Sequence, residues 1–389
     1  MRILFLVRRV GPYHDVRFEA AGKVLDLTVV ETRADSIEYP WTTGISARHY
    51  GLSSLGRAAD PEVGLRGPVL EEAVGRCFET VRPEVVVCTG WADPEYHAAL
   101  RRCQSRKIPV VLMSDSTYDD EPRTWLKERL KRTLVGAYSA AVVAGSRSRC
   151  YLRGLGFPDE AIFEPWDVVD NEYFATTSAA SLKMFDRPYF LCISRYLPKK
   201  NLFRLVEAFA AYRMKHGAAS WDLVILGSGE LERQLGAAVE KAGVAAAVHR
   251  PGFVQYGDLP AYYHQAGACI LPSTSDQWGL AINEAMAAEL PVLVSVACGC
   301  CPDLVVEGQT GYSFDPLDVA GLSDLLYRMA TLSVEQRRQM GRSGYERVKK
   351  FSPERFAEGL VGAVSYASRH PAKVGVGTRL ILGALAKKG

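Results

Sequence analysis

Short apolar runs alternate with stretches of helical period along almost the whole chain, and this alternation limits the fold more than any other feature. The runs are continuously apolar, as expected for strands buried on both faces of a parallel sheet. Nine candidate strands follow one another at residues 2–7, 24–30, 84–88, 109–113, 140–144, 189–194, 222–226, 268–272 and 291–296. Between two of them, Leu202, Leu205, Val206 and Phe209 share one face of a predicted helix. The alternation therefore predicts an α/β fold with parallel strands and crossover helices.

The domain organisation follows from length and from one polar stretch. A chain of 389 residues is too long for one ordinary core, and residues 172–187 separate the fifth apolar run from the sixth without clear periodicity. We expect two Rossmann-like domains, 1–172 and 187–369, that face each other across a cleft where the carboxyl ends of both sheets bind ligands. The terminal segment, about residues 370–389, is expected either to pack on the first domain as a helix or to touch a membrane surface.

Composition excludes several classes of protein. The 47 basic and 44 acidic residues give a net charge of +3, which offers no general attraction to nucleic acid. No apolar run approaches the ~18 residues of a membrane span, and the start of the chain has no signal-peptide pattern, so we expect a cytoplasmic protein. The nine cysteines are odd in number and irregularly spaced, which indicates reduced thiols. Residues 298–301 contain three of them, and a tight loop of small residues is favoured over a zinc site.

The segment "SDQWGLAINEAMA", residues 275–287, places two carboxylates on either side of a predicted helix start. A helix that begins near Gly279 offers free N–H groups and a positive dipole end to a phosphate. Glu284 would accept the hydroxyl groups of a ribose, and Asp276 would contact whatever lies beyond the phosphates. Trp278 and Leu280 flank the glycine and complete the candidate donor-binding segment. The alternative is that the two acids only cap the helix and face solvent.

Two cations follow an earlier candidate strand. Arg195 and Lys200 lie in a loop before a helix, where they could neutralise a diphosphate leaving group. Taken alone, the two cations are better explained as a solvated charged turn.

Two further loops complete the candidate site. Gly227 and Gly229 form a turn between a strand and a helix, which could hold a ligand or only turn tightly. Phe253 and Val254 lie on a loop where a flat base could stack or bond to the backbone.

Taken together, these motifs and the segment "GQTGYSFDP" (308–316) resemble retaining glycosyltransferases of family 4, which have the GT-B fold. The resemblance implies a nucleotide-diphosphate sugar held mostly by the second domain. It implies that Arg195 and Lys200 bind the diphosphate and that Glu284 binds the ribose. Asp276 stands where the family has a glutamate that contacts the donor sugar, so its side chain is one methylene shorter. Asp303 also stands where a glutamate is usual. The catalytic residues implied are thus Arg195, Lys200 and Asp276.

The first domain matches the family less closely. Gly11, after the first strand, matches a glycine-rich loop near the phosphates, although a second glycine is missing. His14 is expected to be exposed on that loop, where contact with the acceptor and a role in capping or packing are equally supported. Asp115 ends a strand near the place where many members carry a histidine. It either substitutes for that histidine or is a turn residue.

The predicted function is retaining transfer of a hexose from a nucleotide-diphosphate sugar, with UDP-sugars such as UDP-glucose favoured, to a hydroxyl group of a saccharide or lipid-linked acceptor in polysaccharide or glycoconjugate synthesis. We expect no cofactor and no metal, because no Asp-x-Asp cluster accompanies the phosphate motifs. A UDP-sugar epimerase of the same fold and a non-catalytic carbohydrate-binding scaffold are the alternatives. A dinucleotide-dependent dehydrogenase is disfavoured, because the first strand is not followed by Gly-x-Gly-x-x-Gly.

The helix-like stretch 121–134 combines apolar and basic residues: Trp125, Leu126, Leu130 and Leu134 with Arg123, Lys127, Arg129, Lys131 and Arg132. One interpretation is a core-facing stripe with a solvated basic face. The other is contact with an anionic membrane that carries a lipid-linked acceptor, at the inner face of the membrane.

Overall fold

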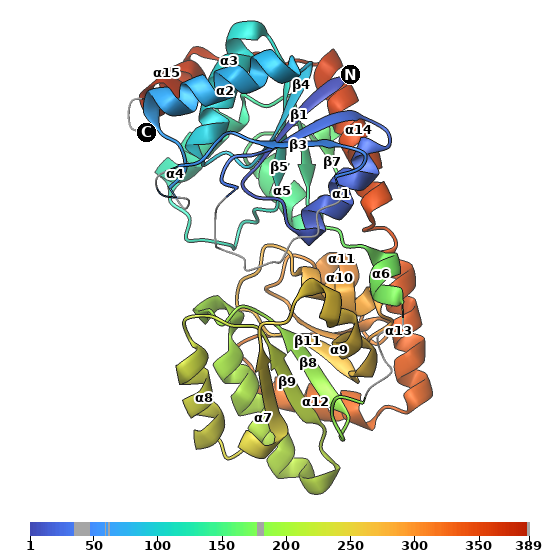
Figure 1. Cartoon of the computed structure of the whole chain (residues 1–389). Helices are drawn as coiled ribbons and strands as arrows, with labels where there is room; N and C mark the ends of the chain where they lie inside the picture. Colours follow the sequence, from blue (N-terminus) through green and yellow to red (C-terminus); the bar gives the residue numbers. More distant parts are fainter. Residues whose placement is uncertain (35–46, 59, 61–62, 177–182, 387–389) are drawn as a thin grey trace. The chain divides into compact units, whose positions relative to one another are not determined.

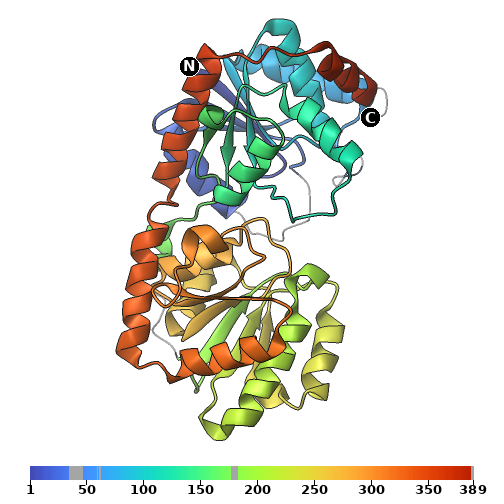
Figure 2. The ribbon, with the colours of Figure 1, turned by 180° about the vertical axis from the view of Figure 1, so that it is seen from behind.

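The computed structural model describes residues 1–34, 47–58, 60, 63–176 and 183–386. Over this part, the chain divides into two compact units, Met1–Val168 with Pro353–Gly389, and Val169–Ser352 (Figure 1 and, from behind, Figure 2). Each unit is built on its own parallel sheet with helices on both faces. The predicted fold class of two Rossmann-like, parallel-sheet domains is therefore confirmed, while the cleft between them stays a prediction.

The described residues of the first unit form a seven-stranded sheet in the order β3-β2-β1-β4-β5-β6-β7. Every neighbouring pair is parallel, for example Ile3 opposite Val85 and Leu4 opposite Thr28. The strands are β1 (Arg2–Val7), β2 (Asp26–Glu31), β3 (Gly51–Ser54), β4 (Val85–Thr89), β5 (Val110–Ser114), β6 (Ala140–Val143) and β7 (Ile162–Phe163). The helices are α1 (Pro12–Gly22), α2 (Gly67–Val81), α3 (Pro94–Arg106), α4 (Trp125–Val135), α5 (Ser146–Gly154), α14 (Pro353–Arg369) and α15 (Val376–Ala386).

The second unit has six strands among its described residues, in the order β10-β9-β8-β11-β12-β13. The strands are β8 (Tyr189–Ile193), β9 (Asp222–Leu226), β10 (Val248–Gly252), β11 (Ala268–Leu271), β12 (Val292–Ser295) and β13 (Gly311–Phe314). The helices are α6 (Asn171–Ala175), α7 (Leu202–His216), α8 (Glu232–Lys241), α9 (Leu259–Gln265), α10 (Leu280–Ala287), α11 (Cys301–Leu304), α12 (Val319–Thr331) and α13 (Val334–Val348). The predicted face of α7 is buried, with Leu202, Leu205, Val206 and Phe209 at most 3% exposed.

The chain returns to the first unit earlier than the sequence predicted. Helix α14, which the sequence assigned to the second domain, packs on α1 and along β5, β6 and β7. Its apolar face explains this placement, because Phe356 is fully buried with its ring 5.6 Å from that of Trp166. Helix α15 then packs against α3 and α4 through Leu382, as one of the two expectations for the terminal segment had it. Where the chain first passes from the first unit to the second, α6 already belongs to the second unit. Residues 177–182 of the predicted boundary lie outside the described residues.

Three further sequence expectations can be compared with the structure. No helix of the described chain combines the length and the apolar content needed to cross a membrane. All nine cysteines are free thiols, and all except Cys77 and Cys150 are buried. The buried thiols agree with the expectation of reduced cysteines inside apolar strands.

Candidate functional site

The predicted donor-binding residues of the second unit lie in loops that follow its strands. Arg195 follows β8, Gly227 follows β9, Phe253 follows β10 and Asp276 follows β11. Because these strands are parallel, their carboxyl ends meet at one edge of the sheet, which is where open α/β sheets bind ligands. The topology thus brings segments up to about eighty residues apart in sequence to one candidate site (Figure 1).

Two of the predicted catalytic residues form an ion pair. Lys200 Nζ donates to Asp276 Oδ2 at 2.5 Å, and the two side chains are 14% and 13% exposed. Ser273 Oγ also donates to this carboxylate, at 3.4 Å. The backbone joins the same two loops, since Thr274 N donates to Lys199 O at 2.8 Å. The sequence predicted both residues for the site, and the structure adds that their side chains are paired with each other.

The Gly227–Gly229 turn packs directly on the loop that carries Arg195. A Cβ at Gly227 would lie 1.9 Å from the carbonyl oxygen of Ser194, and one at Gly229 would lie 2.7 Å from that of Tyr196. Both glycines have positive φ, 131° and 154°. The two loops can approach this closely only without side chains in the turn. The Arg195 side chain is exposed at this edge.

Helix α10 begins where the sequence predicted. Gly279, with φ 108°, precedes its first residue, Leu280, and a Cβ there would lie 2.5 Å from Leu271 Cδ2. This eight-residue helix directs its first N–H groups toward the same edge as the Lys200–Asp276 pair.

The cysteine-containing loop supports the segment before α10. Gly299 N donates to Asp276 O at 2.9 Å, and Cys300 N donates to Trp278 O at 3.1 Å. A Cβ at Gly299 would lie 1.7 Å from Gln277 O, which explains the small residue. Burial raises the pKa of the Cys300 thiol well above its usual value, so this thiol is protonated and unreactive. The tight-loop interpretation of residues 298–301 is confirmed.

Glu284 lies deeper than the sequence indicated. Its side chain is 2% exposed, and Oε2 accepts a hydrogen bond from the Tyr263 hydroxyl at 2.5 Å. Tyr263, on α9, is fully buried, and its ring lies 5.8 Å from that of Phe174. Sequence reasoning missed Tyr263, because a tyrosine inside an apolar helix gives no sign of the carboxylate it meets.

Trp278 is turned away from solvent. Its side chain is 3% exposed, the indole donates to Asn283 Oδ1 at 2.8 Å, and its ring lies 5.1 Å from that of Phe351. A donor contact at Trp278, as predicted, would therefore come from its backbone. Phe253 and Val254 are half-buried on the loop after β10.

In the first unit, Gly11 and His14 form the start of α1. Gly11 N donates to His14 Nδ1 at 3.3 Å, and the imidazole lies 6.1 Å from the Phe18 ring and 6.0 Å from the Trp166 ring. The expectation that His14 is exposed was wrong, since the side chain is half-buried. Burial and the nearby charge of Arg17 lower the pKa of His14 to about 3. The imidazole is therefore neutral at pH 7, and its contacts are those of the capping and packing role.

Arg17 is a buried cation that the sequence did not single out. It is 2% exposed, its guanidinium lies 4.4 Å above the Trp166 ring, and it donates to the Val168 carbonyl at 3.1 Å. Asp167 faces it at 3.4 Å. Asp115, after β5, also interacts with Arg17 electrostatically, while its own carbonyl accepts from Ser148. The charge of Arg17, in α1, therefore attracts the Asp115 carboxylate.

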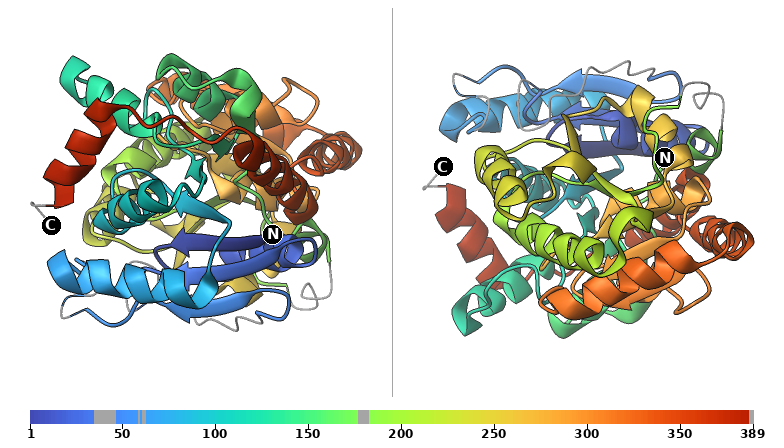
Figure 3. Two further views of the ribbon diagram at one scale, coloured as in Figure 1. Left: turned by 90° about the horizontal axis from the view of Figure 1, so that it is seen from above. Right: turned by 90° about the horizontal axis from the view of Figure 1, so that it is seen from below.

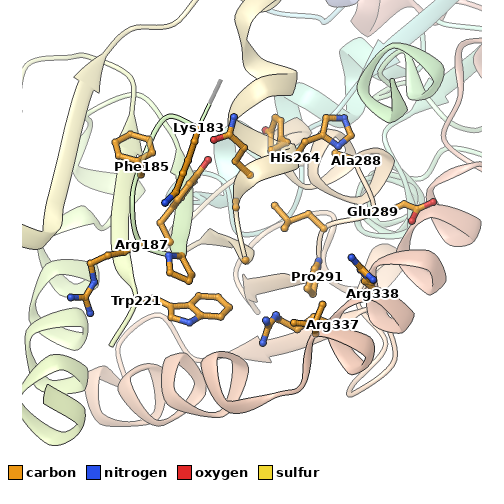
Figure 4. A pocket seen from close by; sticks show the side chains of 18 of the residues that line it. Lys183, Phe185, Arg187, Trp221, His264, Ala288, Glu289, Pro291, Arg337 and Arg338 are labelled. Carbon is orange, nitrogen blue, oxygen red and sulfur yellow. The ribbon is translucent and has the colours of Figure 1, made fainter. Parts of the chain in front are cut away.

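A cavity of about 530 Å³ lies at the opposite edge of the second sheet (Figure 4). Several of its lining residues stand immediately before a strand: Pro188, Trp221, Gly267 and Pro291. Three of its cations are engaged within the protein, since Lys183 pairs with Asp186, Arg187 with Asp222, and Arg337 lies 4.8 Å above the Trp221 ring. None of the predicted donor-binding residues lines this cavity. Within the described residues, no group of three histidine, cysteine or acidic side chains is arranged to hold a metal ion.

Comparison with known proteins finds a family match in the second unit. Residues 175–347 match the family model "Glycosyl transferases group 1". The match supports a glycosyltransferase.

Curated relatives and solved structures agree with it. The chain is 27% identical over 248 residues to a glycogen synthase of Mycobacterium tuberculosis, covering 62% of this chain and 59% of the relative. It is 29% identical over 193 residues to a GDP-mannose-dependent phosphatidylinositol monomannoside mannosyltransferase of that organism, covering 46% and 49%. The chain thus spans about half to three-fifths of the length of these two relatives.

The fold extends over nearly the whole chain. Anabaena HepE in complex with UDP has a TM-score of 0.74 at 15% identity, covering 94% of this chain and 100% of HepE. A sucrose-phosphate synthase from Thermosynechococcus elongatus has a TM-score of 0.73 at 18% identity, covering 92% and 97%. These structures support the GT-B fold that the sequence predicted.

Proposed function

We propose that this protein is a retaining glycosyltransferase that moves a hexose from a nucleotide-diphosphate sugar to a hydroxyl group of a saccharide or lipid-linked acceptor. The observation that carries the proposal is the Lys200–Asp276 ion pair, which lies at the same sheet edge as the start of α10 and the Gly227–Gly229 turn. A cation, a helix N-terminus and a close backbone turn together suit a diphosphate with a sugar beyond it.

Each donor group has a proposed partner. Arg195, Lys200 and the N–H groups of α10 neutralise the diphosphate, and Glu284 accepts the ribose hydroxyls. Asp276, bound to Lys200, meets the donor sugar, and the loop with Phe253 and Val254 holds the base. A UDP-sugar such as UDP-glucose is the favoured donor, supported by HepE structures with UDP and with UDP-glucose. The GDP-mannose-dependent relative makes GDP-mannose the first competitor to test.

The proposed chemistry needs no protein nucleophile. As the bond to the diphosphate breaks, the anomeric carbon acquires oxocarbenium character, and the departing phosphate oxygen takes the proton of the acceptor hydroxyl on the same face. Fixed cations stabilise the leaving group, so the protein contributes charge stabilisation and positioning. With Arg195, Lys200 and α10 in that role, we propose a reaction that requires no metal ion and no cofactor. On the first unit, Asp115 and the neutral His14 are the acceptor-side candidates.

The proposed setting is the cytoplasm, with peripheral membrane contact where the acceptor is lipid-linked, in synthesis of a polysaccharide or glycoconjugate. The test is turnover of a panel of UDP-, GDP- and ADP-sugars, with and without saccharide acceptors, followed by mass spectrometry. We expect nucleoside diphosphate to be released only with acceptor, and NMR of the product to show the donor's anomeric configuration. Donor isomerisation without acceptor would indicate an epimerase, and binding without any turnover would indicate a scaffold.

A further inference from the structure

Helix α4 of the first unit presents large apolar side chains to solvent. Trp125 is 75% exposed, Leu126 62% and Leu130 40%, whereas Leu134 at the end of the helix is 5% exposed. The core-stripe interpretation of this segment is therefore wrong for three of its four apolar residues. At 100° per residue, Trp125, Leu126 and Leu130 fall on one side of α4.

The exposed side of α4 is also basic. Arg129 falls between Trp125 and Leu126 around the helix, and Lys127 is exposed beside them. Within the described chain, the Lys127 side chain interacts with the charge of Glu121, which precedes the helix, and no ion pair of Arg129 is seen. The acidic residue of α4, Glu128, faces inward, where it accepts from the Tyr151 hydroxyl at 3.0 Å. The exposed side thus carries positive charge that no acid of the same helix neutralises.

Helix α15 extends this surface. It lies beside α4, as the views in Figures 2 and 3 agree, and Thr378 Oγ1 donates to Thr133 O at 3.0 Å. Its inner side is anchored by Leu382, which is fully buried, while Val376 and Leu380 are 73% and 69% exposed. We use the name α4–α15 face for the following exposed residues: Trp125, Leu126, Lys127, Arg129, Leu130, Val376 and Leu380.

We propose that the α4–α15 face docks on an anionic phospholipid surface. Exposed apolar clusters of this kind mark interaction sites, and tryptophan with lysine and arginine is the combination that suits the interface of a negatively charged bilayer. A second copy of the chain fits less well, because a symmetric pairing would bring the cations of both faces together. Docking by this face would hold the enzyme at the membrane where a lipid-linked acceptor resides. The last point rests on the proposed function, whereas the docking itself does not.

The test is co-sedimentation with vesicles of phosphatidylcholine alone or with a third of phosphatidylglycerol, without sugar nucleotide. We expect binding only to the anionic vesicles, weakened by salt because the attraction is partly electrostatic. Lys127→Glu with Arg129→Glu should lower the partition coefficient at least about 25-fold, because each basic side chain removed lowers it about fivefold. Trp125→Ser with Leu126→Ser should also abolish most of the binding. Arg233→Glu with Lys241→Glu, the same charge change on exposed positions of α8, is the matched control and should bind like wild type.

Tryptophan emission gives an independent readout. The other described tryptophans, at positions 91, 166, 221 and 278, are 3–8% exposed. Anionic vesicles should therefore shift the emission to the blue and brominated lipid should quench it, and both effects should be lost in Trp125→Phe.

Three results would overturn the inference. They are a folded wild type that ignores anionic vesicles, face variants that bind like wild type, and a serine variant that only converts a dimer to a monomer. Loss of sugar transfer with vesicle binding intact would instead count against the proposed function alone.

Discussion

Replacing Tyr263 by phenylalanine removes a hydroxyl that contacts Glu284 at the candidate ribose site and also lies 3.3 Å from the Ala281 carbonyl oxygen. The hydroxyl donates to Glu284 Oε2 at 2.5 Å, and the two side chains are 0% and 2% exposed. Removing a donor from a buried carboxylate costs about 1.5–3 kcal/mol. For a unit of this size, that loss corresponds to a fall in Tm of about 3–12 °C. Tyr189→Phe is the control, because its buried hydroxyl donates to an uncharged group, the Tyr262 carbonyl, at 2.7 Å. This substitution should cost about 0.5–1.5 kcal/mol.

The same substitution should reach the ligand through Glu284. If Tyr263 holds this carboxylate in the orientation that accepts ribose hydroxyls, Tyr263→Phe should weaken UDP binding about tenfold and affect 2′-deoxy-UDP much less, since only part of a charged hydrogen bond is lost. Calorimetry gives both affinities. In a double-mutant cycle, Tyr263→Phe should add little further loss of affinity to Glu284→Gln.

Two outcomes would refute this reasoning. Equal losses for UDP and 2′-deoxy-UDP would show that Tyr263 does not act on the ribose contact. Additive losses of affinity in the cycle would show that it does not act through Glu284. If wild type binds no nucleotide at all, the donor site itself is misplaced.

Four other predictions can be tested separately. UDP, GDP or ADP at 100 times its Kd should stabilise the protein by about 2.7 kcal/mol in thermal scans with chelator present; no shift with any of them would contradict the donor site. Asp276→Asn should leave UDP affinity within about threefold but lower kcat/KM for the sugar nucleotide at least about tenfold. Lys200→Met should weaken the binding of UDP itself, whereas Lys199→Met, at the neighbouring position, should not. Gly227→Ala should cost about 3 kcal/mol or more in urea unfolding, because the new Cβ meets Ser194 O at 1.9 Å, while Gly243→Ala, with φ 68° and open space, should cost about 1 kcal/mol. The lowered pKa of His14 means that the folded state resists the proton that the unfolded state binds, so stability should fall as pH drops from about 6.5 toward 3, and His14→Gln should flatten that part of the profile.

The strands show which part of the fold could be predicted from sequence. All nine predicted strands are present, and the four that were missed, β3, β7, β10 and β13, are the outer strands of the two sheets. An edge strand is covered less completely than a central one, so its sequence needs no continuous apolar run. β3 is exposed at all four positions, and β10 contains a proline. The buried central strands of each sheet could therefore be predicted from the sequence, whereas the edge strands could not.

The site shows the same division at the level of side chains. Loop positions followed from the strands, because the carboxyl ends of parallel strands share one edge. Pairings such as Lys200 with Asp276, or Tyr263 with Glu284, depend on how separate loops and helices approach each other. The periodicity of the sequence does not predict these contacts. Glycines were the exception, since Gly227, Gly279 and Gly299 each mark a close contact that the structure then displays.

The ion pair changes what Asp276 means in this protein. Lys200 is held by a carboxylate before any donor arrives, so a diphosphate must share or displace that carboxylate to use the cation. A longer side chain at position 276 would bring its carboxylate to a different place relative to Lys200, because the backbone of this loop is fixed by Gly299. Asp276→Glu should therefore alter the Lys200 pair and the sugar contact together. If the proposed division of labour is right, this variant changes the preference among donor sugars while UDP alone still binds. A change in UDP affinity as large as that of Lys200→Met would mean that position 276 serves the diphosphate rather than the sugar.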